Sequence, residues 1–324
     1  MRRISAVLSV RLHSLVAGAF LAVLPLAGLA DQTPAPKAPA VPPFEVAKLG
    51  PRTWVGRFGT SNCGWVEIGG GVLVIDTGAS KQDAANLQAE IKTSTGGKPV
   101  KWVVLTHLHS HANTGLPSFV PAATALYVHA SLAANMEAVV TRMAAGGNAP
   151  KVVGVKQSAV ISDGGQSVEV FASKGPASTG ADLWVFASEA RAAFVGDLAV
   201  TGRCPSMVDA SCDPPAWMAE LQRIGNKKPS VLVGSLGDTS TAADAELAAT
   251  RAYLERVFRI AKETRQNGFP EVRLSSKLST VEKVGEYCSP KADTTNGLAI
   301  YRRMGNDGIL KSGPDPQPPA GVKP

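Results

Sequence analysis

The order in which strand and helix patterns follow one another is the feature that most constrains the fold of this chain. Two strand patterns joined by Gly69-Gly70-Gly71 form a hairpin, a helical pattern covers 82–92, and the run KWVVL at 101–105 is typical of a strand buried on both faces. Strand patterns then cluster over 167–195. Because the hairpin and this cluster are antiparallel patterns, a single parallel sheet fits less well. We predict an α/β (α+β) fold, an αββα sandwich of two mixed sheets with helices on the outer faces.

The individual elements follow from apolar periodicity along the chain. Strands are expected at 53–58, 64–68, 72–75, 101–105, 125–128, 167–171, 183–186, 192–195 and 230–233. Helices are expected at 82–92, 132–143, 214–221 and 241–266, and the last of these is the strongest helical pattern.

Residues 1–30 have the pattern of a secretory signal peptide. Arg2, Arg3 and Arg11 supply a basic start, 15–26 is a short apolar run, and Gly28-Leu29-Ala30 is a small-x-small cleavage site. An uncleaved membrane anchor is the alternative, but the apolar run is shorter than a membrane span needs. We therefore expect a periplasmic or secreted protein whose signal peptide is cleaved near Ala30.

Composition also predicts the limits of the folded part. A Pro/Ala-rich linker over 31–43 and a Pro-rich tail over 312–324 enclose one domain over 44–311. Cleavage would remove three arginines and no acidic residue, which lowers the net charge from +7 to +4. No basic run with interleaved aromatic residues is present, so neither nucleic acid nor, after cleavage, a membrane is the expected partner. The expected partner is a small-molecule substrate or ligand of unknown class, and the oligomeric state is unknown.

Four cysteines favour disulfide bonds in an exported protein. Cys204 and Cys212 bracket a short Pro-rich loop and are the favoured pair, which leaves Cys63 and Cys288 as the second pair by elimination. A zinc site is the alternative, but no CxxC spacing supports it.

Three of the four histidines after residue 30 fall within five residues, directly after the apolar run at 101–105. His107, His109 and His111 are therefore candidate metal ligands, because neutral imidazole is a common ligand of zinc. Alternate residues of an extended chain point to opposite faces, so the segment must bend if all three are to converge. A histidine cluster without a metal is the alternative. His129 follows another apolar strand and is expected to be structural.

The histidine segment resembles a family signature. The run Thr106-His107-x-His109-x-His111-Ala112-Asn113-Thr114-Gly115 is similar to T-H-x-H-x-D-H followed by Gly in the metallo-β-lactamase superfamily. Asp76-Thr77-Gly78 and Gly196-Asp197-Leu198 resemble two further elements of that family. The resemblance spans about 54–235 and implies a metallo-β-lactamase-like domain. Its layout is similar to exported zinc hydrolase-like proteins linked to quinoprotein and sulfur-oxidation systems.

The resemblance also implies an altered metal centre. His111 stands at the position of the family's bridging Asp, and Ala112, Ser178 and Ser235 stand at positions of family histidines. A two-metal centre needs more donors than remain. We therefore expect one ion at most, zinc or alternatively iron or manganese, bound by four residues: His107, His109, His111 and Asp197.

Two functions follow from this reduced site. The first is a metal-dependent hydrolase with an at most mononuclear centre, which the new donor His111 favours. The alternative is a non-catalytic pseudoenzyme that binds or scaffolds, with or without a metal, which the missing donors favour. No base stands beside Ser178 or Ser235 in the sequence, so both are expected to fill vacated space. Asp76 is expected to accept backbone hydrogen bonds in its own turn.

Overall fold

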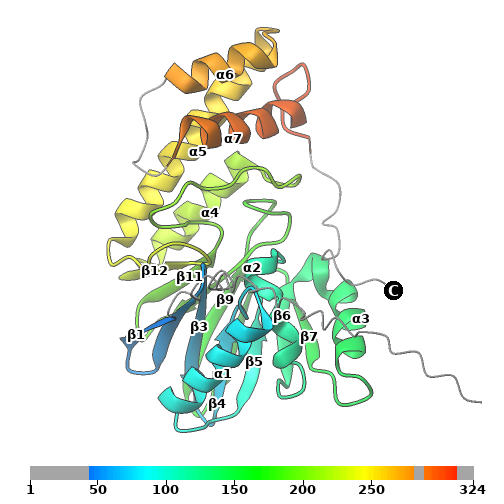
Figure 1. Cartoon of the computed structure of the whole chain (residues 1–324), viewed down its shortest axis with the longest axis vertical. Helices are drawn as coiled ribbons and strands as arrows, with labels where there is room; N and C mark the ends of the chain where they lie inside the picture. The colour runs from blue at the N-terminus through cyan, green and yellow to red at the C-terminus, as the bar shows by residue number, and fades with distance from the viewer. Residues whose placement is uncertain (1–43, 281–287, 312–324) are drawn as a thin grey trace, which may run out of the picture. The chain divides into compact units, whose positions relative to one another are not determined.

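The computed structural model describes residues 44–280 and 288–311 (Figure 1). The predicted signal peptide, linker and tail lie outside the described residues. The described part contains two β-sheets with helices around them, as the strand and helix patterns predicted. None of the helices in the described ranges combines the length and apolar character needed to cross a membrane.

The first sheet has seven strands in the order of the chain. They are β1 (Glu45–Gly50), β2 (Thr53–Phe58), β3 (Ser61–Ile68), β4 (Gly71–Ile75), β5 (Val100–Val104), β6 (Ala125–His129) and β7 (Lys151–Val155). Strands β1 to β4 pair antiparallel as a meander, and β4 to β7 pair parallel. The parallel half places the carboxyl ends of β4, β5 and β6 at one edge, where loops can build a site.

The second sheet has five strands in the order β12-β11-β10-β9-β8. They are β8 (Ser158–Asp163), β9 (Gln166–Ala172), β10 (Leu183–Ala187), β11 (Ala192–Gly196) and β12 (Val231–Gly234). Only β11 and β12 pair parallel, and the other neighbours are antiparallel. Both sheets are therefore mixed.

Helices cover the outer face of each sheet. Helices α1 (Lys81–Ser94) and α3 (Ala133–Met143) pack on the first sheet, and α4 (Pro214–Asn226) and α5 (Ala243–Gln266) pack on the second. A third apolar core lies between the sheets, where residues such as Leu73 and Val185 are fully buried. These three cores separate four layers, so the predicted αββα sandwich is confirmed.

Several elements have no counterpart in the sequence prediction. They are β1, β7, β8, the short helix α2 (Ser110–Asn113), α6 (Glu271–Thr280) and α7 (Pro290–Arg303). Strands β1 and β8 are largely exposed, so they lack the apolar alternation by which strands are recognised. Helix α7 carries Gly297 and two threonines, which have low helix propensity. Its packing explains the glycine, because a β-carbon at Gly297 would lie 2.2 Å from the Leu278 side chain of α6. Helices α5, α6 and α7 pack against one another beyond α4 (Figure 1).

The predicted cysteine pairing is wrong. The disulfide joins Cys204 to Cys288, whose Cα atoms are 4.8 Å apart, and Cys63 and Cys212 are free and buried. Cys63 lies on β3 in the core under α1, whereas Cys288 lies in the core on the other side of the sandwich. A bond between Cys63 and Cys288 is therefore geometrically excluded. Cys288 lies two residues before the first residue of α7, and the packing of that helix brings it to Cys204.

Candidate metal centre

The three clustered histidines lie where β5 ends and the chain bends into a one-turn helix. Strand β5 ends at Val104, and His109 has extended backbone angles at the N-cap position of α2. His107 and His111 thus lie on either side of a bend. This bend is what allows side chains at alternate positions to face one point, as the sequence analysis required.

Asp197 reaches the histidines from the second sheet. It directly follows β11, whose last residue, Gly196, has a φ of +58°. A β-carbon at Gly196 would lie 2.8 Å from Thr106 Oγ1, so glycine permits both the backbone angle and the close approach of the two strand ends. The Leu183 N–H also donates to Thr106 O at 2.7 Å, which ties the two sheets together at this edge.

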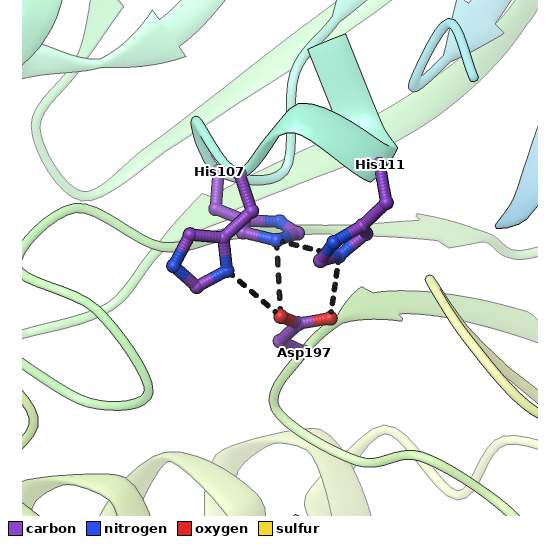
Figure 2. A group of neighbouring side chains, drawn as sticks. His107, His111 and Asp197 are labelled. Carbon is purple, nitrogen blue, oxygen red and sulfur yellow. Dashed lines mark hydrogen bonds and ion pairs between the residues drawn. The ribbon is translucent and has the colours of Figure 1, made fainter. Parts of the chain in front are cut away.

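Four side-chain donors converge here (Figure 2). Asp197 Oδ2 lies 3.1 Å from His107 Nε2 and 3.0 Å from His109 Nδ1, and Asp197 Oδ1 lies 3.1 Å from His111 Nε2. The Nε2 atoms of His107 and His111 are 3.1 Å apart. All four donor atoms lie within 4.8 Å of one another. The structure therefore brings together every residue that the sequence analysis selected as a candidate ligand.

Thr106 and Asp76 orient the ring of His107. The Thr106 hydroxyl donates to Asp76 Oδ2 at 2.7 Å and lies 2.9 Å from His107 Nδ1. A hydroxyl has one hydrogen, so it must accept from Nδ1–H. The Nε2 lone pair of His107 then faces the other three donors.

Asp76 does not cap its own turn as predicted. Its Oδ1 accepts the backbone N–H of Thr106 at 2.8 Å, and its Oδ2 accepts the Ser235 hydroxyl at 3.3 Å. The partner comes from the next strand end because β4 and β5 run parallel and finish at the same edge. Asp76 is therefore a support for the histidine segment. Its positive φ of 58° is one that Asp tolerates better than most residues.

The pKa values of three of the donors, Asp197, His107 and His109, are shifted by their neighbours. Burial disfavours the charged form of Asp197, but the charge of His107 and hydrogen bonds from all three histidines lower its pKa well below the usual value. Burial also disfavours a charged His107 ring, yet Asp197 and Asp76 raise its pKa. Hydrogen bonds to Asp197 and Asp209 raise the pKa of His109 to about 10. The cluster of lone pairs therefore requires a positive charge, either protons or a metal ion.

Asp209 is a neighbour of the site that the sequence analysis missed. Its Oδ2 lies 3.5 Å from Nε2 of His109, on the side of the ring facing away from Asp197. Burial alone would raise the pKa of Asp209, but the hydrogen bond with His109 and the Ser211 backbone N–H lower it. The residue stands in a Pro-rich loop with no periodicity, so no local pattern marks it.

His129 lies outside the cluster. It is the N-cap of the short 3₁₀ helix Ala130–Leu132, where its Nδ1 accepts the Ser131 N–H at 3.3 Å and lies 2.8 Å from the Ser131 hydroxyl. This local role agrees with the structural role predicted for it.

Comparison with known proteins decides the family. The model of the Metallo-beta-lactamase superfamily matches residues 56–235, which is more than half of the chain. The chain belongs to the metallo-β-lactamase superfamily. A metallo-beta-lactamase from Pontibacter korlensis is 24% identical, with a TM-score of 0.51 over 66% of this chain and 99% of that chain. At that identity the likeness shows the fold alone. No curated protein matches this chain.

Three residues stand where the resemblance implies histidines of the superfamily, namely Ala112, Ser178 and Ser235, and each has neighbours of its own away from the four donors. Ala112 is buried and apolar. The Ser178 hydroxyl donates to Asp182 Oδ1 at 2.8 Å, and the Ser235 hydroxyl donates to Asp76. Both hydroxyls are therefore used by neighbouring carboxylates, and none of these positions adds a donor to the four that converge. Among the described residues, the group that could hold a metal ion at this edge therefore consists of His107, His109, His111 and Asp197.

The donor set fits a single zinc ion. Zinc–ligand distances of about 2.0–2.1 Å in a tetrahedron place the donors about 3.3 Å from one another. The histidine nitrogens lie 3.0 to 3.1 Å from the nearer Asp197 oxygen, which is Oδ2 for His107 and His109 and Oδ1 for His111, and the four donor atoms lie within 4.8 Å of one another. Three nitrogens with one carboxylate suit zinc, and iron is an alternative. Thr106 and Asp209 at the outer nitrogens of His107 and His109 are the kind of support that metal-bound imidazoles have.

The raised pKa of His109 predicts how metal binding depends on pH. In the metal-free protein this ring keeps a proton until the pH approaches about 10, and a metal ion must displace that proton. Affinity for zinc should therefore fall as the pH is lowered, by up to about tenfold per pH unit for each proton released. An unperturbed imidazole would stop competing above about pH 6.5. Zinc titrations between pH 7 and 9 should still show rising affinity, and a constant affinity over that range would contradict the assignment.

Proposed function

We propose that this chain is an exported, mononuclear metal-dependent hydrolase of the metallo-β-lactamase superfamily. The convergence of the four donors carries the proposal. His111 is central, because it supplies an imidazole where the resemblance implies a bridging carboxylate. A substitution that only abolished binding would not be expected to place a new donor within 3.1 Å of both His107 and Asp197.

The residues would divide the work as follows. His107, His109 and His111 would bind the ion through single nitrogens, and Asp197 would add negative charge. A zinc ion bound there supplies a Lewis acid and lowers the pKa of water toward neutrality. Hydrolysis would need one position at the ion to be open to water, so Asp197 would then accept a hydrogen bond from that water instead of serving as the fourth ligand. We propose a small molecule with a hydrolysable bond as the substrate.

Export is the part of the proposal that rests on the sequence. The signal-peptide pattern of residues 1–30 motivates it. The Cys204–Cys288 disulfide supports it, because such bonds persist in oxidising compartments such as the periplasm.

A non-catalytic binding protein is the second candidate, and one observation favours it. Ser178 and Ser235 are committed to Asp182 and Asp76, so the site offers a reacting ligand fewer polar groups than a two-metal centre would. Such a protein would still bind one metal ion, but it would not turn over substrate.

Two measurements separate these functions. Protein stripped of metal and reloaded with zinc should contain about one ion per chain, as determined by elemental analysis. The reloaded protein should then hydrolyse at least one member of a thioester, lactam and phosphoester panel, and a chelator should abolish that activity. One bound ion without turnover would favour the binding protein. No retained zinc would contradict the metal site itself.

A further inference from the structure

His109 is the least enclosed of the three imidazoles. Its side chain is 40% exposed, compared with 20% for His111 and 1% for His107. The ring lies edge-to-face with His107, with the ring centroids 4.8 Å apart, and its ionic contacts are Asp197 at Nδ1 and Asp209 at Nε2.

Asp209 is itself held in one orientation. Its Oδ1 accepts the backbone N–H of Ser211 at 2.8 Å, which leaves Oδ2 toward His109. The Cys212 N–H also donates to Asp209 O at 3.1 Å, so the loop closes on itself in a tight turn just before α4.

Helix α7 binds this loop through hydrogen bonds to its backbone. Arg303 donates to the carbonyl oxygen of Asp209 and, at 3.1 Å, to that of Met207. Asn296, about two turns earlier on the same helix, accepts the Met207 N–H at 2.9 Å and donates to Pro205 O at 2.8 Å. Both Asn296 and Met207 are buried, so these bonds are shielded from water. The disulfide to Cys288 closes the start of the loop.

Helix α7 lies beyond the residues that the family model matches, which end at 235. The C-terminal helices are thus an addition to the matched region that reaches back to its metal-binding edge. From these contacts we propose that Asp209 is a positioning residue that orients His109 for metal binding, and that Arg303 and Asn296 of α7 hold Asp209 in place. This inference rests on the proposed metal site.

The test compares variants with matched controls. Asp209→Asn keeps the shape of the side chain and removes its charge, and it should weaken zinc binding by about tenfold or more. Arg303→Gln should weaken binding in the same direction by a smaller factor. Arg302→Gln is the control, because Arg302 is adjacent on α7 but pairs with Glu271 instead of the loop. Asp163→Asn, at the ion pair with Lys101, controls for loss of a carboxylate elsewhere.

Two further readouts separate positioning from general destabilisation. The visible absorption spectrum of the cobalt-loaded protein should change in Asp209→Asn at saturating cobalt, and Asp209→Glu should partly restore it. In the metal-free protein, nitrogen–proton NMR signals of the His109 ring should move in Asp209→Asn, whereas those of His129 should not.

The outcomes distinguish this inference from the function on which it rests. Wild-type protein that binds no zinc would contradict the proposed function, and the NMR comparison would still decide whether Asp209 orients His109. Wild-type zinc affinity in Asp209→Asn, with an unchanged cobalt spectrum and unmoved His109 signals, would overturn the inference while leaving the metal site intact.

Discussion

Replacing His111 with alanine should weaken zinc binding by about a hundredfold or more. Structural zinc sites contribute about 10–16 kcal/mol through four donors, so one donor is worth about 3 kcal/mol, and each 1.4 kcal/mol is about tenfold in affinity. His111 Nε2 lies 3.1 Å from both His107 Nε2 and Asp197 Oδ1, so it is a full member of the cluster. Competition titration against a chromophoric chelator measures the change.

The remaining histidine supplies the control for this experiment. His129→Ala removes an imidazole that caps a short helix outside the cluster, and it should leave zinc affinity unchanged. His111→Asp keeps a donor at the same position and should retain more affinity than His111→Ala. The side chain of His111 is 20% exposed, so the alanine variant should fold, which thermal unfolding of the metal-free protein can verify. Equal affinities of His111→Ala and wild type would show that His111 is not a ligand.

Loss of the Cys204–Cys288 disulfide should lower the free energy of unfolding by about 2–4 kcal/mol. The bond closes 84 residues of chain, and a cross-link over a long loop restricts the unfolded chain strongly. It also joins the loop that carries Asp209 to the start of α7. Denaturant titration of Cys288→Ser against wild type measures the loss.

The pairing itself can be checked with reductant and with peptide mapping. A reductant should destabilise the Cys63→Ala/Cys212→Ala variant, which keeps the disulfide, and should have no effect on Cys204→Ser/Cys288→Ser. Mapping without reduction should recover one peptide pair that contains Cys204 and Cys288. Recovery of a Cys204–Cys212 peptide instead would contradict the structure and would support the pairing predicted from the sequence.

Contiguous sequence was enough to select the candidate donors. Asp197 was selected because Gly196-Asp197-Leu198 resembles an element of the metallo-β-lactamase superfamily, whereas His107, His109 and His111 lie within five residues after an apolar strand. These are local patterns, because the chemistry of a metal donor and the periodicity of a buried strand can be recognised in adjacent residues. The same reasoning predicted the two mixed sheets with outer helices, since each sheet and helix must bury its apolar face.

Packing between distant segments decided the rest. Cys288 meets Cys204 across 84 residues, and Arg303 meets the Asp209 loop across 94. These contacts depend on where α7 packs, and that helix has weak helical propensity and carries a glycine that only its contact with α6 explains. A carboxylate such as Asp209 in an irregular loop has no pattern of its own. Asp209 lies beside His109 because helix α7, about 90 residues later in the chain, holds its loop there. Such long-range contacts produce no periodic pattern in the sequence, so they could not be predicted from it.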